Sequence, residues 1–337
     1  MTTVKKQATI SDVAERAGVS VPTVSRVLNQ VVPVSEKRRK RVLAAIEELD
    51  YRPSAAARTL ASRRSRMLSI VTSNTSRYGY AETIRGIELA ARAADYTVTI
   101  SVVENDDPEV VRRAVTAAFS QSPEGVIVLT FDPAGDATLR SLPTSVPVVA
   151  LSGARADGVP QVLIDESTAA EELVRGLLEM GHRTVHHITV PAVHGEDGRT
   201  TGWRAALQEA GAPVPDIIEA TWDPQSGRAV GRELAADPQV TAVLCGNDEI
   251  ALGLMRGLVD GGRRVPQDIS VAGFDDHPLS SLWVPSLTTV RQDFSELGAR
   301  GVATLLAAMS DEADAGDLHT LRPEVQWRES TAVAANQ

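Results

Sequence analysis

The segment TISDVAERAGVSVPTVSRVLN, residues 9–29, decides the fold of the N-terminal part of the chain. Thr9 stands three residues before Asp12, which is the spacing of a capping box, and apolar residues then recur at helical intervals as far as Gly18. Ser20 is a candidate N-cap for a second helix over residues 21–29, where Pro22 is tolerated because a first turn has unpaired N–H groups. Two helices joined by a short turn with glycine predict a helix-turn-helix.

A third helix is expected over EKRRKRVLAAIEELD, residues 36–50, with Ser35 as its candidate N-cap. Its large apolar residues recur at helical spacing and would close a core over the first two helices. The residues expected to face this core are Val42, Leu43, Ile46 and Leu49.

The start of the second helix is the candidate DNA-reading surface, because that helix enters the major groove in a helix-turn-helix. Arg26 carries a donor fork suited to guanine, while Val21 and Pro22 offer only apolar contact. Small polar side chains around them are candidates for phosphate contacts: Thr9, Ser20, Thr23, Ser25 and Asn29. The alternative is a three-helix packing unit whose basic run, residues 36–41, only faces water.

The distribution of charge favours DNA binding by this N-terminal part. The whole chain of 337 residues has a net charge of −10, but residues 1–66 hold 14 Lys and Arg against 6 Asp and Glu. Residues 67–337 hold 20 against 38. A basic head on an acidic body is expected when one small domain meets a polyanion and the rest does not.

The segment YRPSAAARTLASRRSR, residues 51–66, joins head and body. It is alanine-rich and polar, and Leu60 is its only large aliphatic side chain. A helix this short is marginal in water, so the segment is expected to need a partner before it becomes ordered.

These motifs, in this order, resemble the LacI/GalR family of bacterial transcription regulators. The resemblance implies that residues 53–66 form a hinge helix and linker that fold on operator DNA, with Ser54 and Ala57 at the DNA and Leu60 wedged into the minor groove. It also implies a homodimer, or a tetramer, on palindromic operator DNA. Arg38 stands where the family usually has Thr, and an Arg near a helix N-terminus is expected to meet a phosphate.

From residue 67 onwards, short apolar runs alternate with amphipathic helical stretches such as residues 81–94 and 249–261. This alternation predicts an α/β body of parallel sheets covered by helices, split near Asp165 into two similar subdomains. The resemblance implies a periplasmic-binding-protein-like body. The expected domains are a head at 1–52, a hinge at 53–66 and a body at 67–337, with subdomains at 67–164 and 165–290 and a C-terminal return at 291–337. The candidate strands begin at residues 67, 96, 125, 147, 162, 184, 241 and 269.

Polar and aromatic residues near expected strand and helix ends predict a site for a sugar-like effector between the two subdomains, because a hydroxyl-rich ring needs stacking and oriented donors and acceptors. The resemblance supports four of these residues as effector contacts: Arg199, Trp222, Asn247 and Asp275. Ser73, Tyr80, Thr130 and Phe131 are further candidates, and Tyr78 is left open. Asp248 is interpreted as a helix N-cap, Trp203 as core, and Asp276 as lying behind the site.

Catalysis and metal binding find no support in the sequence. The chain has one cysteine, Cys245, and the neighbouring His182, His186 and His187 lack zinc-ligand spacing. No cofactor and no enzyme activity are therefore expected, and without a secretory signal or an apolar span the expected location is cytoplasmic, on the nucleoid when operator-bound. Other classes considered are a solute-binding transport protein, a sugar-acting enzyme using Asp275, Asp248 or His194, and a DNA-architectural protein. The leading hypothesis is a repressor controlled by a sugar-like effector.

Overall fold

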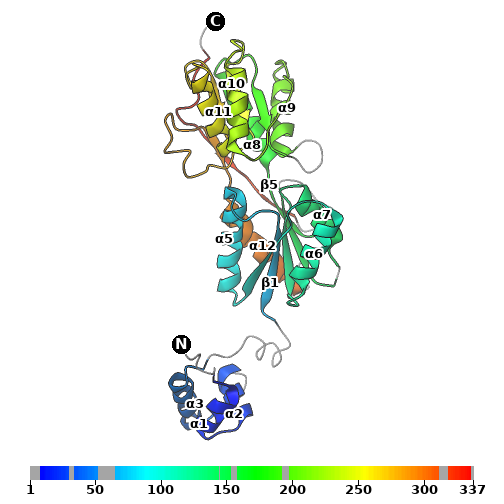
Figure 1. Ribbon diagram of the computed structural model, residues 1–337, viewed down its shortest axis with the longest axis vertical. Helices are drawn as coiled ribbons and strands as arrows, with labels where there is room; N and C mark the ends of the chain where they lie inside the picture. Colours follow the sequence, from blue (N-terminus) through cyan, green and yellow to red (C-terminus); the bar gives the residue numbers. More distant parts are fainter. Residues whose placement is uncertain are drawn as a thin grey trace, which may run out of the picture. The chain divides into compact units, whose positions relative to one another are not determined.

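The computed structural model describes residues 8–29, 34–51, 65–143, 145–152, 158–191, 197–310 and 318–334. The chain divides into two compact units, Met1–Ser65 and Arg66–Gln337, and each is described by itself (Figure 1). The hinge residues Ser54, Ala57 and Leu60 lie outside the described residues. Among the residues described, no helix is long and apolar enough to cross a membrane.

The head unit contains the three helices expected from the sequence: α1 at Ile10–Ala17, α2 at Val21–Asn29 and α3 at Glu36–Glu48. Thr9 and Asp12 form the predicted capping box, and Thr9 Oγ1 accepts a hydrogen bond from the backbone N–H of Asp12 at 3.3 Å. Gly18 ends α1 with φ at 63°, a left-handed conformation that glycine adopts without a steric penalty. The local sequence signals therefore set these helix boundaries.

The head core confirms most of the predicted apolar faces and corrects two details. Val13, Val24 and Val42 are fully buried. Leu43, however, is 49% exposed, and Ala45 takes the buried position on α3. Ser35 occupies the N-cap position of α3, but its side chain makes no capping hydrogen bond. Ile46 and Leu49 are partly buried against this core, as expected, and Tyr51 is buried in it.

The body unit begins with a parallel sheet in the order β11–β5–β4–β3–β1–β2. Helices α5 (Tyr78–Ala93) and α12 (Phe294–Met309) cover one face, and α6 (Pro108–Phe119) and α7 (Pro133–Ser141) cover the other. The strands are β1 Met67–Thr72, β2 Thr97–Val102, β3 Gly125–Leu129, β4 Val148–Ser152, β5 Gln161–Ile164 and β11 Leu318–Leu321.

A second parallel sheet follows in the order β7–β6–β8–β9. Helices α8 (Glu166–Glu179) and α9 (Gly198–Glu209) pack on one face, and α10 (Pro224–Leu234) and α11 (Asp248–Asp260) pack on the other. The strands are β6 His186–Thr189, β7 Ile218–Glu219, β8 Ala242–Cys245 and β9 Ser270–Ala272. All eight strands expected from the sequence coincide with strands of the structure.

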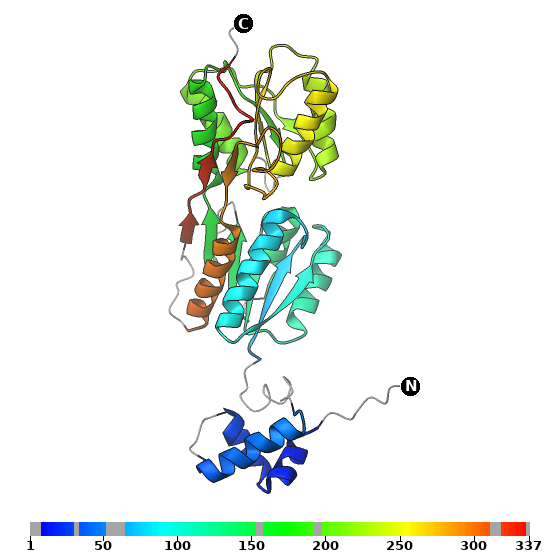
Figure 2. The same cartoon turned by 90° about the vertical axis from the view of Figure 1, so that its left-hand side faces the viewer.

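The C-terminal part of the chain ties the two sheets together. Strand β10 (Thr289–Arg291) pairs antiparallel with β12 (Glu324–Gln326), and between them α12 returns to the first sheet, where it lies beside α5 (Figure 2). Residues 330–332 then go back to the second sheet, where the N–H of Val271 donates to Ser330 O. The sequence did not predict β7, β10, β11 or β12, because these strands are short or have little apolar pattern.

Candidate DNA-binding and effector-binding sites

The exposed surface of α2 carries the candidate DNA-reading residues. Val21, Pro22 and Arg26 are all exposed on this helix. Ser20, just before it, is also exposed, and its hydroxyl lies 3.0 Å from that of Thr23. Val21 and Pro22 lie in the first turn of α2, and Arg26 lies in its last turn.

The remaining head candidates differ in how freely they could reach a phosphate. Arg38 is exposed in the first turn of α3, whereas Thr23 and Ser25 are half-buried. The Thr9 hydroxyl donates to Asp12 at 2.8 Å and is already used as a helix cap. Asn29 is the last residue of α2, and its side chain lies outside the described residues.

In the body, the carboxyl edge of the first sheet carries a buried carboxylate that sequence reasoning missed. Asp132 follows β3, and its Oδ2 accepts hydrogen bonds from the hydroxyls of Ser73 and of Tyr80, the latter at 2.6 Å. Burial is the main reason why the pKa of Tyr80 is raised, and Asp132 adds to the effect. These three groups come from different parts of the chain, so only the fold brings them together. The pattern Asp132–Pro133 after an apolar strand was a signal for a helix cap, which Asp132 also provides.

Aromatic side chains surround this network. Tyr80 meets Phe131 edge-to-face with ring centroids 5.1 Å apart. Thr130 is buried at the end of β3, and its hydroxyl donates to Leu151 O at 3.2 Å. The Thr130 hydroxyl therefore already bonds to the neighbouring strand β4.

Arg199 is the central cation at the carboxyl edge of the second sheet. It lies in the first turn of α9, is 8% exposed, and donates from Nη2 to Glu166 Oε1 at 2.8 Å. Its Nη1 donates to Gly246 O, and its guanidinium lies over the Phe274 ring at 4.6 Å. Burial alone would lower its pKa, but Glu166 and Asp275 outweigh burial and raise it, so the guanidinium stays charged.

Asp275 faces the same guanidinium, with its Oδ1 3.5 Å from Arg199 Nη2. It follows β9 with φ at 112°, and Gln292 Nε2 donates to its Oδ1 at 2.7 Å. Burial raises the pKa of Asp275 to about 8, although Arg199 opposes that shift. The predicted pair Arg199 and Asp275 is therefore adjacent, and Glu166 and Gln292, which the sequence did not single out, complete its surroundings.

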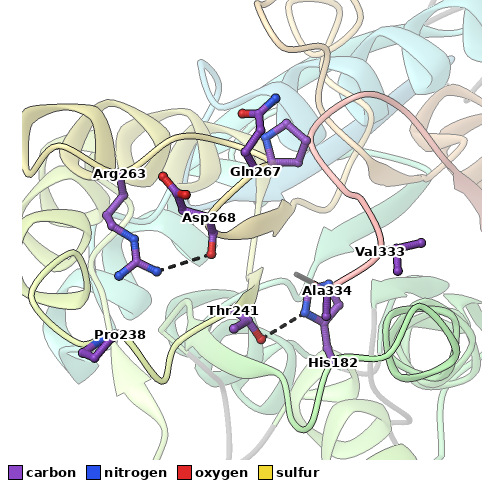
Figure 3. Close-up of a pocket in the computed structure, with 9 residues that line it drawn as sticks. His182, Pro238, Thr241, Arg263, Gln267, Asp268, Val333 and Ala334 are labelled. Atoms are coloured by element: carbon purple, nitrogen blue, oxygen red, sulfur yellow. Dashed lines mark hydrogen bonds between the residues drawn. The ribbon is translucent and has the colours of Figure 1, made fainter. Parts of the chain in front are cut away.

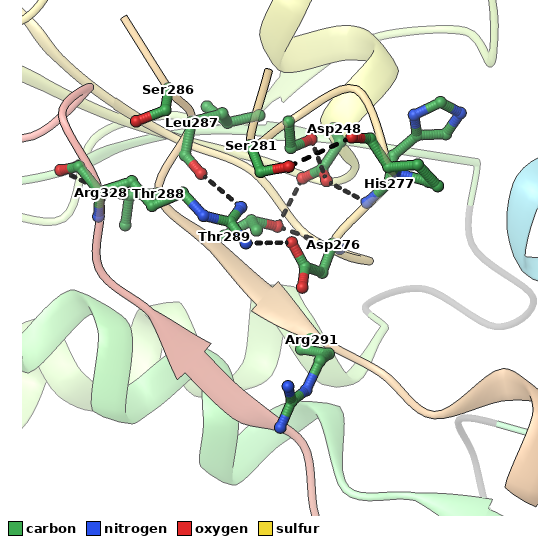
Figure 4. Close-up of polar contacts among 12 residues, drawn as sticks. Asp248, Asp276, His277, Ser281, Ser286, Leu287, Thr288, Thr289, Arg291 and Arg328 are labelled. Carbon is green, nitrogen blue, oxygen red and sulfur yellow. Dashed lines mark hydrogen bonds and ion pairs between the residues drawn. The ribbon is translucent and has the colours of Figure 1, made fainter. Parts of the chain in front are cut away.

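Asn247 and not Asp248 caps α11, and Asp248 instead contacts His277 in the loop after β9 (Figure 4). Asn247 is the N-cap of α11 and accepts from the N–H of Ile250 at 2.9 Å, so the interpretation of Asp248 as the cap is wrong. Asp248 is instead 1% exposed and binds the loop that follows β9. It accepts from the N–H of His277 at 2.7 Å and from the hydroxyls of Ser280 at 2.6 Å and Thr289 at 2.5 Å.

Side chains from the two subdomains meet beside these polar groups. Tyr78 of α5 contacts the ring of His277 with centroids 4.9 Å apart. The guanidinium of Arg77 lies over the half-buried ring of Trp222 at 4.6 Å. The loops at the carboxyl edges of the two sheets therefore touch, as a site between the subdomains requires.

Two further interpretations agree with the structure. Trp203 is fully buried, and its Nε1 donates to Val185 O at 2.7 Å, which confirms a core role. Asp276 is held by Arg328, whose Nη2 donates to its Oδ1 at 2.6 Å (Figure 4).

His182 and His187 are buried hydrogen-bonding groups. His187 is fully buried, and its ring nitrogens lie 3.1 Å from Leu244 O and 3.0 Å from Thr200 Oγ1. His182 lines a cavity of about 320 Å³ at the amino ends of β8 and β9, and bonds to Thr241 (Figure 3). Arg263 and Asp268 in the same lining are bonded to the protein itself. This cavity lies at the opposite edge of the sheet from Arg199 and is not the candidate effector site.

Comparisons with known proteins match nearly the whole length of the chain. The model of bacterial regulatory proteins of the lacI family matches residues 9–54, and that of the periplasmic binding protein-like domain matches residues 174–331. Catabolite control protein A of Priestia megaterium is 34% identical, over 96% of this chain and 99% of its own. A lac repressor dimer bound to operator and the anti-inducer ONPF superimposes with a TM-score of 0.89 at 31% identity, covering 97% of this chain and 100% of that one. A complex of the regulator CelR with cellobiose has a TM-score of 0.72 at 27% identity, over 96% and 99%.

Proposed function

The chain belongs to the LacI family of bacterial regulatory proteins, and we propose from this premise that α2 reads operator DNA in the major groove. The chain is a DNA-binding transcriptional regulator and not an enzyme. The observation that carries the proposal is the exposed surface of α2, with Val21 and Pro22 in its first turn and Arg26 in its last, on a head of net positive charge. Arg26 would read guanine through its donor fork, and Thr9, Ser20, Thr23, Ser25, Asn29 and Arg38 would contact phosphates.

The hinge is proposed to act on the minor groove. Leu60, with Ala57 and Ser54 near it, would fold on DNA and wedge into the centre of a palindromic operator, with one copy from each subunit. The support is the composition of residues 53–66, because a short alanine-rich segment gains order from a partner. A regulator bound in this way sits on chromosomal DNA in the cytoplasm.

The body is proposed to bind a sugar-like effector between the two sheets. Arg199 and Asp275 are adjacent there, Trp222 offers an aromatic face, and Asn247, Ser73, Tyr80 and Thr130 end neighbouring elements. CelR binds cellobiose, and a ribose operon repressor of Escherichia coli is 34% identical to this chain, which supports the sugar class. Binding would change operator affinity by favouring one arrangement of the two subdomains.

Dimerisation is proposed to use an apolar loop after β9. Leu282 is 76% exposed and Val284 is 88% exposed, with Leu279 and Trp283 exposed beside them. A cluster of exposed apolar side chains on one loop marks an interaction surface. A dimer is the smallest assembly that presents two heads to a palindrome, and a tetramer would need a further surface.

Footprinting and gel-shift titration of the full chain test the DNA-binding proposal. The protected site should be an inverted repeat, and Arg26→Ala should weaken specific binding by ~1–3 kcal/mol per half-site and relax one base position. Arg16→Ala is the matched control, because it removes the same charge from α1, where Arg16 pairs with Glu48 at 2.5 Å. If Arg26→Ala kept the wild-type sequence preference, Arg26 of α2 would not be a base-reading residue.

A further inference from the structure

The buried guanidinium of Arg199 in the proposed effector site is already paired with a carboxylate of the protein. Arg199 donates to Glu166 at 2.8 Å and lies 3.5 Å from Asp275, and both side chains of the Arg199–Glu166 pair are only about one-tenth exposed. A buried cation that is ion-paired at this distance has little charge left to offer an incoming anion. A phosphate or carboxylate group on the effector would have to displace Glu166 and then lie against Asp275.

The other charges around the site do not reverse this balance. Arg328 is paired with Asp276 at 2.6 Å, and Arg77 lies over Trp222. Arg328 and Arg77 are therefore also engaged by other side chains of the protein, and neither replaces Glu166 as the partner of Arg199.

A buried acceptor beside Asp275 has no partner within the described part of the chain. Gln292 is 4% exposed, and its Nε2 donates to Asp275 while its Oε1 accepts nothing. A buried amide oxygen without a donor is uncommon and is satisfied when a ligand supplies an O–H or N–H. Among the described residues, the Nε of Arg199 likewise has no acceptor, so a ligand hydroxyl, which both donates and accepts, can satisfy both atoms.

We propose that the effector is a polyhydroxylated molecule with neutral or amine groups and no phosphate or carboxylate, and that Glu166 is the residue that excludes anions by occupying Arg199. This inference rests on the proposed effector site. It gives Glu166 a specificity role that follows from charge and hydrogen bonding rather than from shape.

Inorganic phosphate is the probe that tests the role of Glu166 without knowledge of the effector. The melting temperature of the full chain is measured by differential scanning fluorimetry in phosphate and in chloride of equal ionic strength. Wild type should show no phosphate-specific shift. The melting temperature of Glu166→Gln should rise by about 3 °C at a phosphate concentration ten times the dissociation constant for phosphate, because Arg199 can then pair with the anion. Glu166→Asp keeps the charge and should show no phosphate-specific shift. The double variant Glu166→Gln with Arg199→Gln should lose the shift that Glu166→Gln gains.

Two results would overturn the inference. One is a phosphate-specific shift in wild type that Arg199→Gln removes, since Arg199 would then be open to anions. The other is no gain in Glu166→Gln, which would show that Glu166 does not set the exclusion.

A matched ligand series separates this inference from the proposed function. Operator release by the full chain is compared for glucose, glucosamine, glucose 6-phosphate and gluconate, and for ribose with ribose 5-phosphate. A phosphorylated or acidic member that acts at a tenfold lower concentration than its neutral parent would refute the inference and leave the regulatory function intact. If no sugar changes operator affinity, the proposed effector class fails, while the phosphate titration still decides the role of Glu166.

Discussion

Asp248 is predicted to hold the apolar loop after β9 in place, and two substitutions separate the parts of that role. Asp248→Ala removes the acceptor of three donors, namely the N–H of His277 and the hydroxyls of Ser280 and Thr289. The two hydroxyls can rotate towards other acceptors, but the backbone N–H cannot. One unpaired buried donor costs ~1–3 kcal/mol and each lost hydroxyl bond ~0.5–1.5 kcal/mol, so the free energy of unfolding should fall by about 2–6 kcal/mol.

Asp248→Asn is the matched control, because its amide oxygen can still accept from His277. Its amide nitrogen then faces Thr289, whose hydroxyl can turn to accept, so the hydrogen bonds are kept and the free energy of unfolding at pH 7 should fall by no more than about 1 kcal/mol. Burial is the main reason why the pKa of Asp248 rises to about 7 in the folded protein, from an ordinary value of 3.8. The folded state therefore binds the proton more tightly than the unfolded state.

The pH dependence follows from this difference. The stability contributed by the raised pKa is fully present below about pH 4 and is lost as the pH rises towards 7. Asp248→Asn cannot titrate, so its deficit relative to wild type should narrow with rising pH, by at most ~1.4 kcal/mol per pH unit in that window.

Denaturant unfolding followed by tryptophan fluorescence measures these changes in the body alone, because Trp203, Trp222, Trp283 and Trp327 all lie in residues 66–337. Equal losses for Ala and Asn at pH 7, or an Ala loss below about 1 kcal/mol, would refute the anchoring role. A deficit of Asp248→Asn that widens with rising pH would refute the assigned direction of the pKa shift.

Three further predictions address function. Leu60→Ser should weaken specific operator binding and reduce the DNA bend, and it should leave the salt dependence of non-specific binding unchanged. Gel-shift bending assays across a salt series measure both properties. An unchanged bend angle would show that Leu60 does not bend the operator. The inducer response of operator affinity should be lost in Arg199→Ala and in Asp275→Ala, because each variant weakens ligand binding by ~1–3 kcal/mol. A ligand titration like that of wild type would show that these residues do not form the effector site. Leu282→Asp should shift the full chain from dimer to monomer in sedimentation at micromolar concentration, while an intact dimer would place the interface elsewhere.

Local patterns in the sequence were sufficient for most of the fold. The capping box of Thr9 and Asp12, the glycine at 18 and the alternation of apolar runs with amphipathic stretches depend on residues close together in the chain. Leu43 shows the limit of such patterns. It lies one residue from the buried Val42, at the edge of the apolar stripe, and packing chose Ala45 for the core instead.

The candidate site shows the same division between local and long-range information. The sequence placed Arg199 and Asp275 at element ends, but it could not decide whether Asn247 or Asp248 caps α11, because that choice depends on where β8 ends and on the loop that packs against it. Asp132, Glu166 and Gln292 gained their roles only from partners far along the chain, such as Arg199, which lies 33 residues from Glu166. Short-range order follows from backbone geometry and periodicity, which the sequence carries by itself. The charge balance around one buried guanidinium depends on which distant strands the fold brings together, and only the tertiary structure decided it.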